Sequence, residues 1–265
     1  TQLADRQTHF SWFVSNEPPR VIDIGGGRWI AERVSAPRRP YLPLVEKTGL
    51  YREFVDTKPT DDGVLTFAGR YGLLGSAQPN TVRGEPEFWI ERLDFWQRAI
   101  RLMRLAERLR GSLAARDFGG IKGLFADQDG KIVLSLPARN SPFQPLGDLS
   151  IPLSIPAFQL PRDTYQIAAS ALQQITNDQL EGNVSSRLYW NSAFTKASLH
   201  RVPSNLLAAM WLQFARTIEG NKEHAQCEEC RTWFEIGAGE GSRRDARFCG
   251  SACRARAWRK NRGNK

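Results

Sequence analysis

Apolar residues recur at intervals of three and four positions along several stretches of the chain, with charged residues between them. This spacing places apolar side chains on one face of an α-helix. It predicts four helices in the first 220 residues, at Thr60–Gly75, Glu85–Leu109, Asp163–Leu180 and Asn205–Glu219. We expect Thr60 or Asp61 to cap the first of them, and Pro203 or Ser204 to open the last.

Shorter apolar segments bounded by Gly, Pro or polar residues predict strands. These segments are Arg20–Ile24, Arg28–Val34, Lys131–Leu136, and a pair at Val184–Tyr189 and Ala193–His200. Gly25–Gly27 joins the first two strands and predicts a hairpin turn. We interpret two Pro-rich segments, Pro37–Pro43 and Pro137–Pro161, as connections. The mixture predicts an α+β fold, in which a helix-rich N-terminal body carries small sheets.

The composition is that of a globular protein. The chain has 265 residues, of which 41% are hydrophobic and eight are Trp, enough to build a buried core. No stretch approaches the roughly 18 consecutive apolar residues that a membrane span needs. The first residues also lack the basic-then-apolar pattern of a signal peptide. We therefore expect a cytoplasmic protein without a membrane partner.

The positive charge of the chain is concentrated at its C-terminal end. Residues 243–265 contain nine Lys or Arg and one Asp, which gives +8 of the total net charge of +9. The other 242 residues are therefore nearly neutral, at +1. Such an asymmetry indicates a polyanionic partner for the basic end.

All four cysteines lie in the same region, spaced C-x2-C, then eighteen residues, then C-x3-C. They are Cys227, Cys230, Cys249 and Cys253. Each close pair can occupy one tight turn, and the intervening loop lets the two turns converge, as tetrahedral zinc requires. The spacing predicts one structural Zn²⁺ ion.

Two other interpretations of the cysteine region compete with a zinc site. Disulfide pairing or unrelated buried thiols are disfavoured because the chain shows no secretory signal. His224 precedes Cys227 at the same spacing and could replace one thiolate. Because structural zinc sites close at four ligands, we interpret His224 as a bystander.

Three features accompany these cysteines. They are an aromatic pair at Trp233 and Phe234, an Arg-rich run at Arg243–Cys249, and a last cysteine, Cys253, that opens a basic helix. With them, the segment Cys227–Arg262 resembles the zinc fingers of the CGNR type and related bacterial fingers. In this chain the last cysteine is followed by Arg-Ala-Arg, where that family has Gly-Asn-Arg. The resemblance implies a bacterial transcription regulator.

The C-terminal tail should form a cationic helix. Ser251 is a suitable N-cap, so the helix is expected from Ala252 to about Arg262, with Cys253 and Ala257 on the face toward the finger. The residues expected to contact nucleic acid are Arg243, Arg244, Arg247, Arg254, Arg256, Trp258, Arg259, Lys260 and Arg262. The alternative is a solubilising tail whose tryptophan packs on the finger.

Enzyme motifs are weak in this sequence. Val21–Gly27 resembles the strand and turn of methyltransferases that bind S-adenosylmethionine, but a nucleotide-binding turn should open a helix. Here Arg28–Val34 has the pattern of a returning strand, so a hairpin is favoured. A methyltransferase remains only the weaker alternative, and we assign no catalytic residue.

Two functional hypotheses from different classes remain. In the first, residues 221–265 form a zinc finger that binds nucleic acid, DNA in preference to RNA, while residues 1–220 sense a ligand or form a homodimer. In the second, the finger is a structural cap on a protein-interaction or RNA-associated module. The change in charge at residues 221–226 marks the expected domain boundary.

Overall fold

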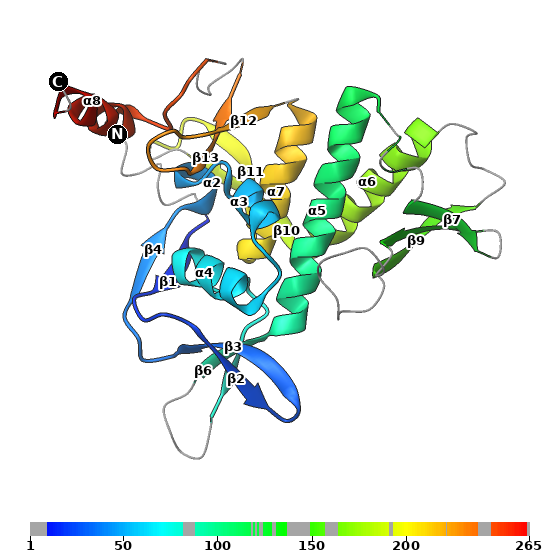
Figure 1. The fold of residues 1–265 in the computed structure, drawn as a ribbon, viewed down its shortest axis with the longest axis horizontal. Helices are drawn as coiled ribbons and strands as arrows, with labels where there is room; N and C mark the ends of the chain where they lie inside the picture. The colour runs from blue at the N-terminus through cyan, green and yellow to red at the C-terminus, as the bar shows by residue number, and fades with distance from the viewer. Residues whose placement is uncertain are drawn as a thin grey trace. The chain divides into compact units, whose positions relative to one another are not determined.

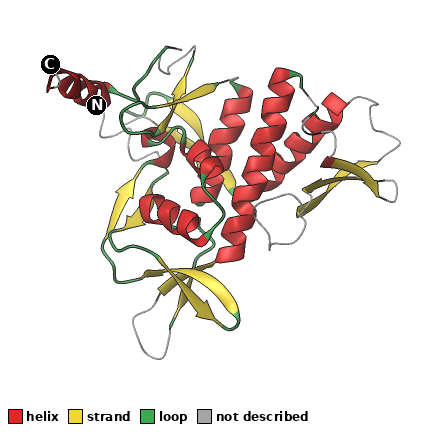
Figure 2. Cartoon of the chain, viewed as in Figure 1, coloured by secondary structure: helices red, strands yellow, loops and turns green. Residues whose placement is uncertain are grey.

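The computed structural model of the chain describes residues 10–81, 88–117, 119, 121, 124–128, 131–136, 149–156, 164–190, 193–220, 222–237 and 245–263. Helices and small antiparallel sheets alternate along it, which confirms the α+β prediction (Figure 1, Figure 2). Among these residues, no helix combines the length and the apolar character needed to cross a membrane.

Contacts within the chain define two compact units. The first unit comprises the described residues of Thr1–Phe13, Arg39–Asp56 and Gly182–Lys265, and the second comprises those of Val14–Arg38 and Thr57–Glu181. The cysteine-containing segment thus belongs to the same unit as residues 39–56. The division into residues 1–220 and 221–265 stays a prediction.

The second unit contains a four-stranded antiparallel sheet in the order β2-β3-β6-β5. Its strands are β2 (Arg20–Ile24), β3 (Gly27–Arg33), β5 (Gln78–Asn80) and β6 (Phe88–Arg92). Gly25 and Gly26, which join the first two strands, have positive φ angles of 56° and 75°. Both central residues of a type I′ hairpin turn need this conformation, and glycine adopts it without strain. The predicted hairpin is confirmed, and its glycines do not open a helix.

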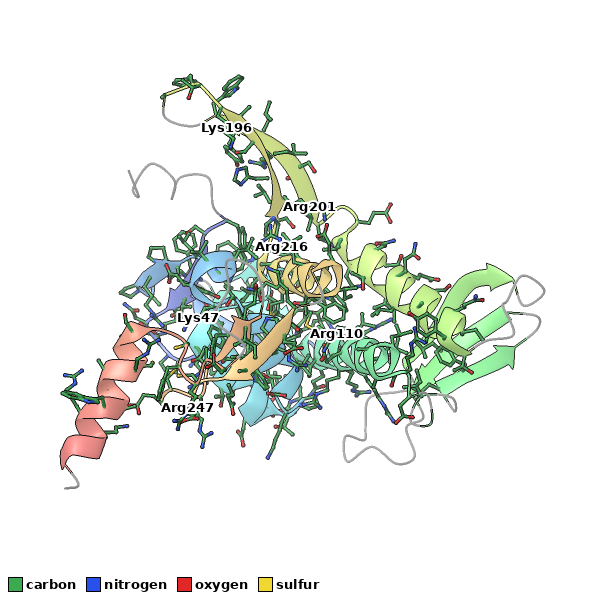
Figure 3. All side chains as sticks on the ribbon, turned by 90° about the horizontal axis from the view of Figure 1, so that it is seen from above. Lys47, Arg110, Lys196, Arg201, Arg216 and Arg247 are labelled. Atoms are coloured by element: carbon green, nitrogen blue, oxygen red, sulfur yellow. The ribbon has the colours of Figure 1, made fainter. Side chains whose placement is uncertain are left out.

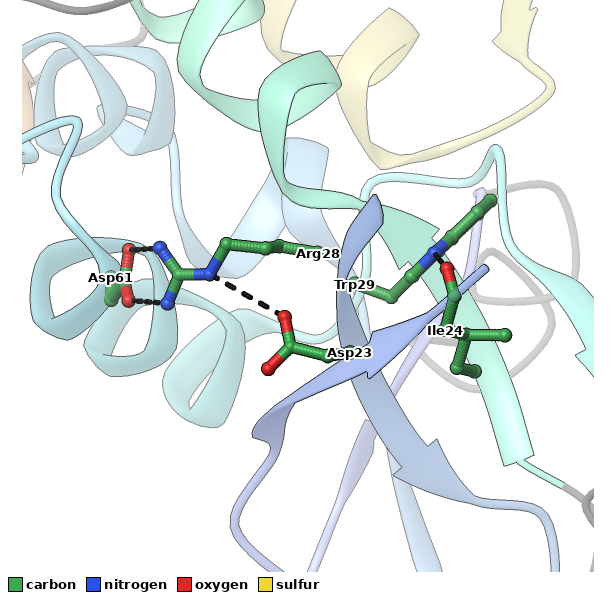
Figure 4. A network of polar contacts seen from close by, with 5 residues as sticks. All are labelled: Asp23, Ile24, Arg28, Trp29 and Asp61. Carbon is green, nitrogen blue, oxygen red and sulfur yellow. Dashed lines mark hydrogen bonds and ion pairs between the residues drawn. The ribbon is translucent and has the colours of Figure 1, made fainter. Parts of the chain in front are cut away.

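Arg28 links this hairpin to helix α4 (Asp61–Tyr71). Its guanidinium group donates two hydrogen bonds to the Asp61 carboxylate, and its Nε lies 3.9 Å from an oxygen of Asp23 (Figure 4). The side chain of Thr60 accepts a hydrogen bond from the first turn, so the cap predicted at this position is confirmed.

Helix α5 (Leu93–Ala115) begins later than the apolar spacing predicts. The prediction of helix from Glu85 was wrong for Phe88–Arg92, which form β6. Phe88 and Ile90 are buried beside Ala31 on the neighbouring strand. Residues two positions apart point to the same face of a strand but not of a helix, so both side chains can be buried together only in a sheet. Where a strand runs directly into a helix, the same apolar residues can fit both the two-residue period of the strand and the 3.6-residue period of the helix. The sequence pattern alone therefore places the boundary wrongly.

A three-stranded antiparallel sheet in the second unit has the order β7-β8-β9. Its strands are β7 (Phe125–Gln128), β8 (Lys131–Leu136) and β9 (Leu149–Pro156), and helix α6 (Thr164–Leu180) follows them. The predictions of β8 and α6 are confirmed. The interpretation of Pro137–Pro161 as a connection was wrong for β9, which is an edge strand. Proline is tolerated there because one side of the strand makes no ladder bonds.

Two further strands are β1 (Trp12–Ser15) and β4 (Arg38–Tyr41). The second of them lies within Pro37–Pro43, so the interpretation of that segment as a connection was also wrong.

The first unit is organised around helix α7 (Leu206–Glu219). The unit also contains α2 (Pro43–Glu46), α3 (Leu50–Asp56), β10 (Val184–Trp190), β11 (Ala197–Pro203), β12 (Glu223–Gln226), β13 (Trp233–Ile236) and α8 (Ser251–Gly263). The predicted pairing of two strands here is confirmed, but the second strand runs from Ala197 to Pro203 and not from Ala193 to His200. Helix α7 is capped by the Asn205 side chain, which accepts from the Ala208 N–H at 2.8 Å, rather than by Pro203 or Ser204.

A buried glutamine on α7 holds α2 and α3 in place. Gln213 Nε2 donates to the carbonyl oxygens of Pro43 and Lys47, at 3.0 and 2.7 Å. Its Oε1 accepts from the Tyr51 N–H at 3.2 Å. One side chain therefore satisfies three backbone groups, and the three helices form the platform on which the cysteine segment lies.

Two buried carboxylates lie on adjacent strands of the four-stranded sheet. Glu91 accepts hydrogen bonds of 2.6 to 2.8 Å from three successive backbone N–H groups, Leu74–Ser76. Glu32 lies 3.5 Å from the Arg38 guanidinium. Burial raises the pKa of Glu32 to about 7, partly opposed by Arg38 and reinforced by the charge of Glu91.

We expect Glu32→Gln to change how stability depends on pH. An unfolded Glu has a pKa of about 4.3. Between that pH and about 7, Glu32 therefore binds more protons in the folded protein than in the unfolded one. The free energy of unfolding of the native chain should therefore fall as pH rises through this window, by up to roughly 3 kcal/mol, and level off above it. Burial also raises the pKa of Glu91, so Glu32→Gln should show a smaller fall than the native chain, as measured by urea unfolding between pH 4.5 and 8.

The matched control is Glu17→Gln, because Glu17 is exposed and pairs with Arg33 at the surface. Curves of stability against pH that run parallel for the native chain and Glu32→Gln would contradict the assignment.

Candidate metal centre

The first two cysteines lie on the turn between β12 and β13. These strands pair antiparallel, from Glu223 opposite Ile236 to Gln226 opposite Trp233. The Cys227 N–H donates to the Thr232 carbonyl, at 3.0 Å, and this bond closes the turn that follows β12. Both sulfurs of the pair are thereby presented at one end of a short hairpin.

The last two cysteines lie at the start of α8. Cys249 precedes the helix, which begins at Ser251, one residue earlier than predicted. Cys253 lies in its first turn and is buried. The Glu228 N–H donates to the Arg247 carbonyl at 3.0 Å, and the Arg247 guanidinium donates two bonds of 2.6 Å to the Glu228 carboxylate. These bonds join the two cysteine turns.

The four sulfur atoms converge at one point. All lie within 4.8 Å of one another, with Cys230 and Cys249 at 3.6 Å, and Cys249 and Cys253 at 3.5 Å. A disulfide would need about 2.05 Å. Four sulfurs bound tetrahedrally at about 2.3 Å would lie about 3.8 Å apart. The cluster can therefore hold a metal ion, and the convergence predicted from the spacing is confirmed.

The sulfurs differ in how readily they lose a proton. Burial acts to raise the pKa of Cys227 and of Cys230, but hydrogen-bond donors around both sulfurs outweigh it. The pKa of Cys230 falls to about 6, with the Thr232 hydroxyl as the strongest of its donors. Burial, and then the neighbouring sulfurs, raise the pKa of Cys249. A bound divalent cation would reverse that rise, because it stabilises every thiolate of the set.

Basic residues of the tail divide into two groups. Arg256 donates to the Cys253 sulfur at 3.0 Å, and Lys260 donates to the Glu229 carboxylate at 2.7 Å, so both contact the finger. Arg254 and Arg259 are exposed, and Trp258 is 55% exposed. Arg243 and Arg244 lie outside the described residues, as does the side chain of Arg262.

His224 lies apart from the sulfur cluster. Its Nδ1 is 3.5 Å from the Tyr51 hydroxyl, and the two rings meet edge to face with centroids 5.2 Å apart. The histidine therefore packs against α3, which agrees with its interpretation as a bystander.

The finger is anchored to α3 by contacts that the sequence did not reveal. Trp233 Nε1 donates to the Asp56 carboxylate at 2.8 Å, and the Arg52 guanidinium lies 5.0 Å from the centre of its ring. The backbones also approach closely, because a Cβ on Gly49 would lie 2.6 Å from the Trp233 carbonyl oxygen. Any larger residue at this glycine would separate the finger from the helix.

An open cleft of about 860 Å³ lies between the finger and α2 and α7. Its cationic lining residues are Lys47, Arg216, Lys222 and Arg256, and its acidic ones are Glu46 and Glu235. Lys222 and Glu235 pair at 2.9 Å. The cleft reaches the sulfur atoms, so part of its volume belongs to the metal site itself.

Comparison of the chain with protein-family models, with curated proteins and with solved structures found no match. The positions of the four sulfur atoms are what identify a candidate metal centre in this chain.

We expect Arg256→Ala to weaken metal binding by about 10- to 100-fold, because it removes the hydrogen bond to a ligating sulfur. Competition of a chelator for Co²⁺ bound to the folded protein measures this affinity.

The control is Arg254→Ala, which removes the same charge from an exposed position two residues away. Equal affinities in the two variants would show that the contact between Arg256 and the sulfur does not tune the site.

Proposed function

We propose that this chain is a zinc-finger protein that binds nucleic acid, with DNA favoured over RNA, and that it acts as a bacterial transcription regulator. The observation that carries the proposal is a strongly basic helix whose first turn holds one of four clustered cysteines. Metal binding fixes the start of such a helix and so presents its charges in a defined direction.

Zinc is the metal that suits this cluster best. Soft thiolate ligands in a tetrahedral arrangement select zinc, and a structural site with four thiolates is closed to further ligands. Four thiolates and one Zn²⁺ carry about −2, so hydrogen bonds from nearby cations stabilise the centre. Arg256 supplies one such bond.

The exposed face of α8 supplies the contacts to nucleic acid. Arg254 and Arg259 present guanidinium groups to solvent, where they can donate paired hydrogen bonds to phosphate oxygens. Trp258 exposes about half of its side chain between them and offers a ring for stacking or packing. Contacts to the phosphate backbone supply affinity and orientation, whereas any preference for sequence requires contacts to base edges.

The assignment as a regulator rests on the resemblance to bacterial CGNR-type fingers and on the size of the remaining chain. Residues 1–220 would then sense a ligand or form a homodimer. A dimer would double the number of phosphate contacts on a duplex.

The second candidate function is a protein-interaction or RNA-associated module in which the finger is a structural cap. The bond between Trp233 and Asp56, with Arg52 over the indole ring, favours it, because a finger that packs on α3 stabilises the body. The two candidates differ in what the metal-bound finger is needed for. A structural cap is needed for the body to fold, whereas a binding finger is needed only for affinity for nucleic acid.

We expect Arg254→Ala with Arg259→Ala, here called the tail variant, to weaken binding of the zinc-loaded protein to duplex DNA. Each lost phosphate contact should flatten the slope of log K against log salt by about 0.9, so the variant should lose about 1.8. Fluorescence anisotropy over a salt series measures the slope.

Arg39→Ala with Arg98→Ala is the control, because it removes two exposed positive charges that are not on α8. The proposal fails if the native chain binds neither DNA nor RNA at low salt, or if the two double variants have the same slope. A preference among duplexes that persists at high salt separates a regulator from a nonspecific binder.

We expect Cys249→Ser to lose zinc and DNA affinity while the body keeps a cooperative thermal transition. The α7 platform has its own buried residues, Trp211 and Phe214 among them, and needs no cysteine. Near-UV circular dichroism follows the melt, and metal analysis follows the zinc. Loss of the cooperative transition would instead favour the structural cap.

A further inference from the structure

The hairpin of β10 and β11 projects from the first unit as a two-stranded arm. Its strands pair from Val184 opposite Pro203 to Trp190 opposite Ala197, and its base is held by a bond from the Ser204 N–H to the Asn183 carbonyl at 2.8 Å. Figure 3 shows the strands reaching away from the end of α7, with Arg201 near the base and Lys196 near the tip. A two-stranded ribbon of this kind is marginally stable unless something packs on it.

One face of the arm exposes large apolar side chains. Leu188 and Leu199 are cross-strand partners and are 61% and 70% exposed. Trp190 is on the same face and 53% exposed, and Phe194, near the tip, is 77% exposed. A soluble surface seldom gathers so many large apolar groups unless they form a contact site.

The arm is also basic. Arg187, Lys196 and Arg201 are exposed on it, and residues 184–203 contain no Asp or Glu. The charge therefore has one sign along the whole arm. A second copy of the chain would bring six like charges together on these ribbons, with no acid of either arm between them, whereas a polyanion would complement them.

We infer that the arm is a second nucleic-acid contact, in which unstacked bases lie on Trp190 and Phe194 while Lys196 and Arg201 bind phosphates. Exposed aromatic rings accept bases of any identity by stacking, and flanking cations follow the backbone. Two-stranded ribbons also fit the grooves of a duplex. The inference deepens the proposed function and rests on it, but assigns binding to residues outside the finger.

The test uses full-length, zinc-loaded protein and labelled DNA in single-stranded and duplex form. Trp190→Leu with Phe194→Leu keeps apolar side chains and removes the aromatic rings. It should weaken binding of single-stranded DNA at least about fivefold. Lys196→Ala with Arg201→Ala should flatten the salt slope for single strands by about 1.4. Phe13→Leu is the control, since Phe13 is an aromatic residue of similar exposure, 50%, outside the arm.

The outcomes separate this inference from the proposed function. If the tail variant weakens binding and the arm variants do not, the inference is wrong and the finger still binds. If the arm variants weaken binding and the tail variant does not, the arm stands and the function assigned to the finger falls. Unchanged affinity in the leucine variant, a change in its oligomeric mass, or arm-dependent binding to anionic lipid vesicles would each overturn the inference.

Discussion

The convergence of four cysteine sulfurs is the interaction on which the C-terminal part of the first unit depends. The atoms lie within 4.8 Å of one another, and the neighbouring sulfurs help to raise the pKa of Cys249. Four thiolates so close together would repel, and a bound cation would offset that repulsion and join the β12–β13 hairpin to α8. Because Cys253 lies in the first turn of α8, a metal bound to this cluster would also fix where the basic helix begins.

This constraint explains why the positive charges of the tail are not equivalent. Arg256 and Lys260 point back to the finger, where they contact a ligating sulfur and a carboxylate. Arg254 and Arg259 remain exposed and can meet phosphates. The β10–β11 arm adds a second basic surface with exposed aromatic rings in the same unit. A protein that is nearly neutral outside its tail thus has two elements whose chemistry suits a polyanion.

Features that depend on neighbouring residues were predictable, and those that depend on distant partners were not. The cysteine cluster, the glycine hairpin and helix α7 follow from spacing and local conformation, so their predictions are confirmed. The hydrogen bond between Trp233 and Asp56 joins residues 177 positions apart, and no pattern in the sequence predicts it. The sequence does not predict the strand at Leu149–Pro156, because its prolines argue against a strand in the middle of a sheet. The segment lies at the edge of its sheet, where proline is tolerated. Phe88–Arg92 was assigned to a helix because its apolar residues serve a sheet and then continue the helical spacing.

The central claim is that the four cysteines bind one zinc ion that organises the basic helix. X-ray absorption at the zinc edge of freshly purified, full-length protein tests it most directly. The account predicts about one zinc per chain, with a first shell of four sulfur atoms at about 2.3 Å. A shell that contains nitrogen or oxygen ligands, or zinc well below one equivalent, would contradict it.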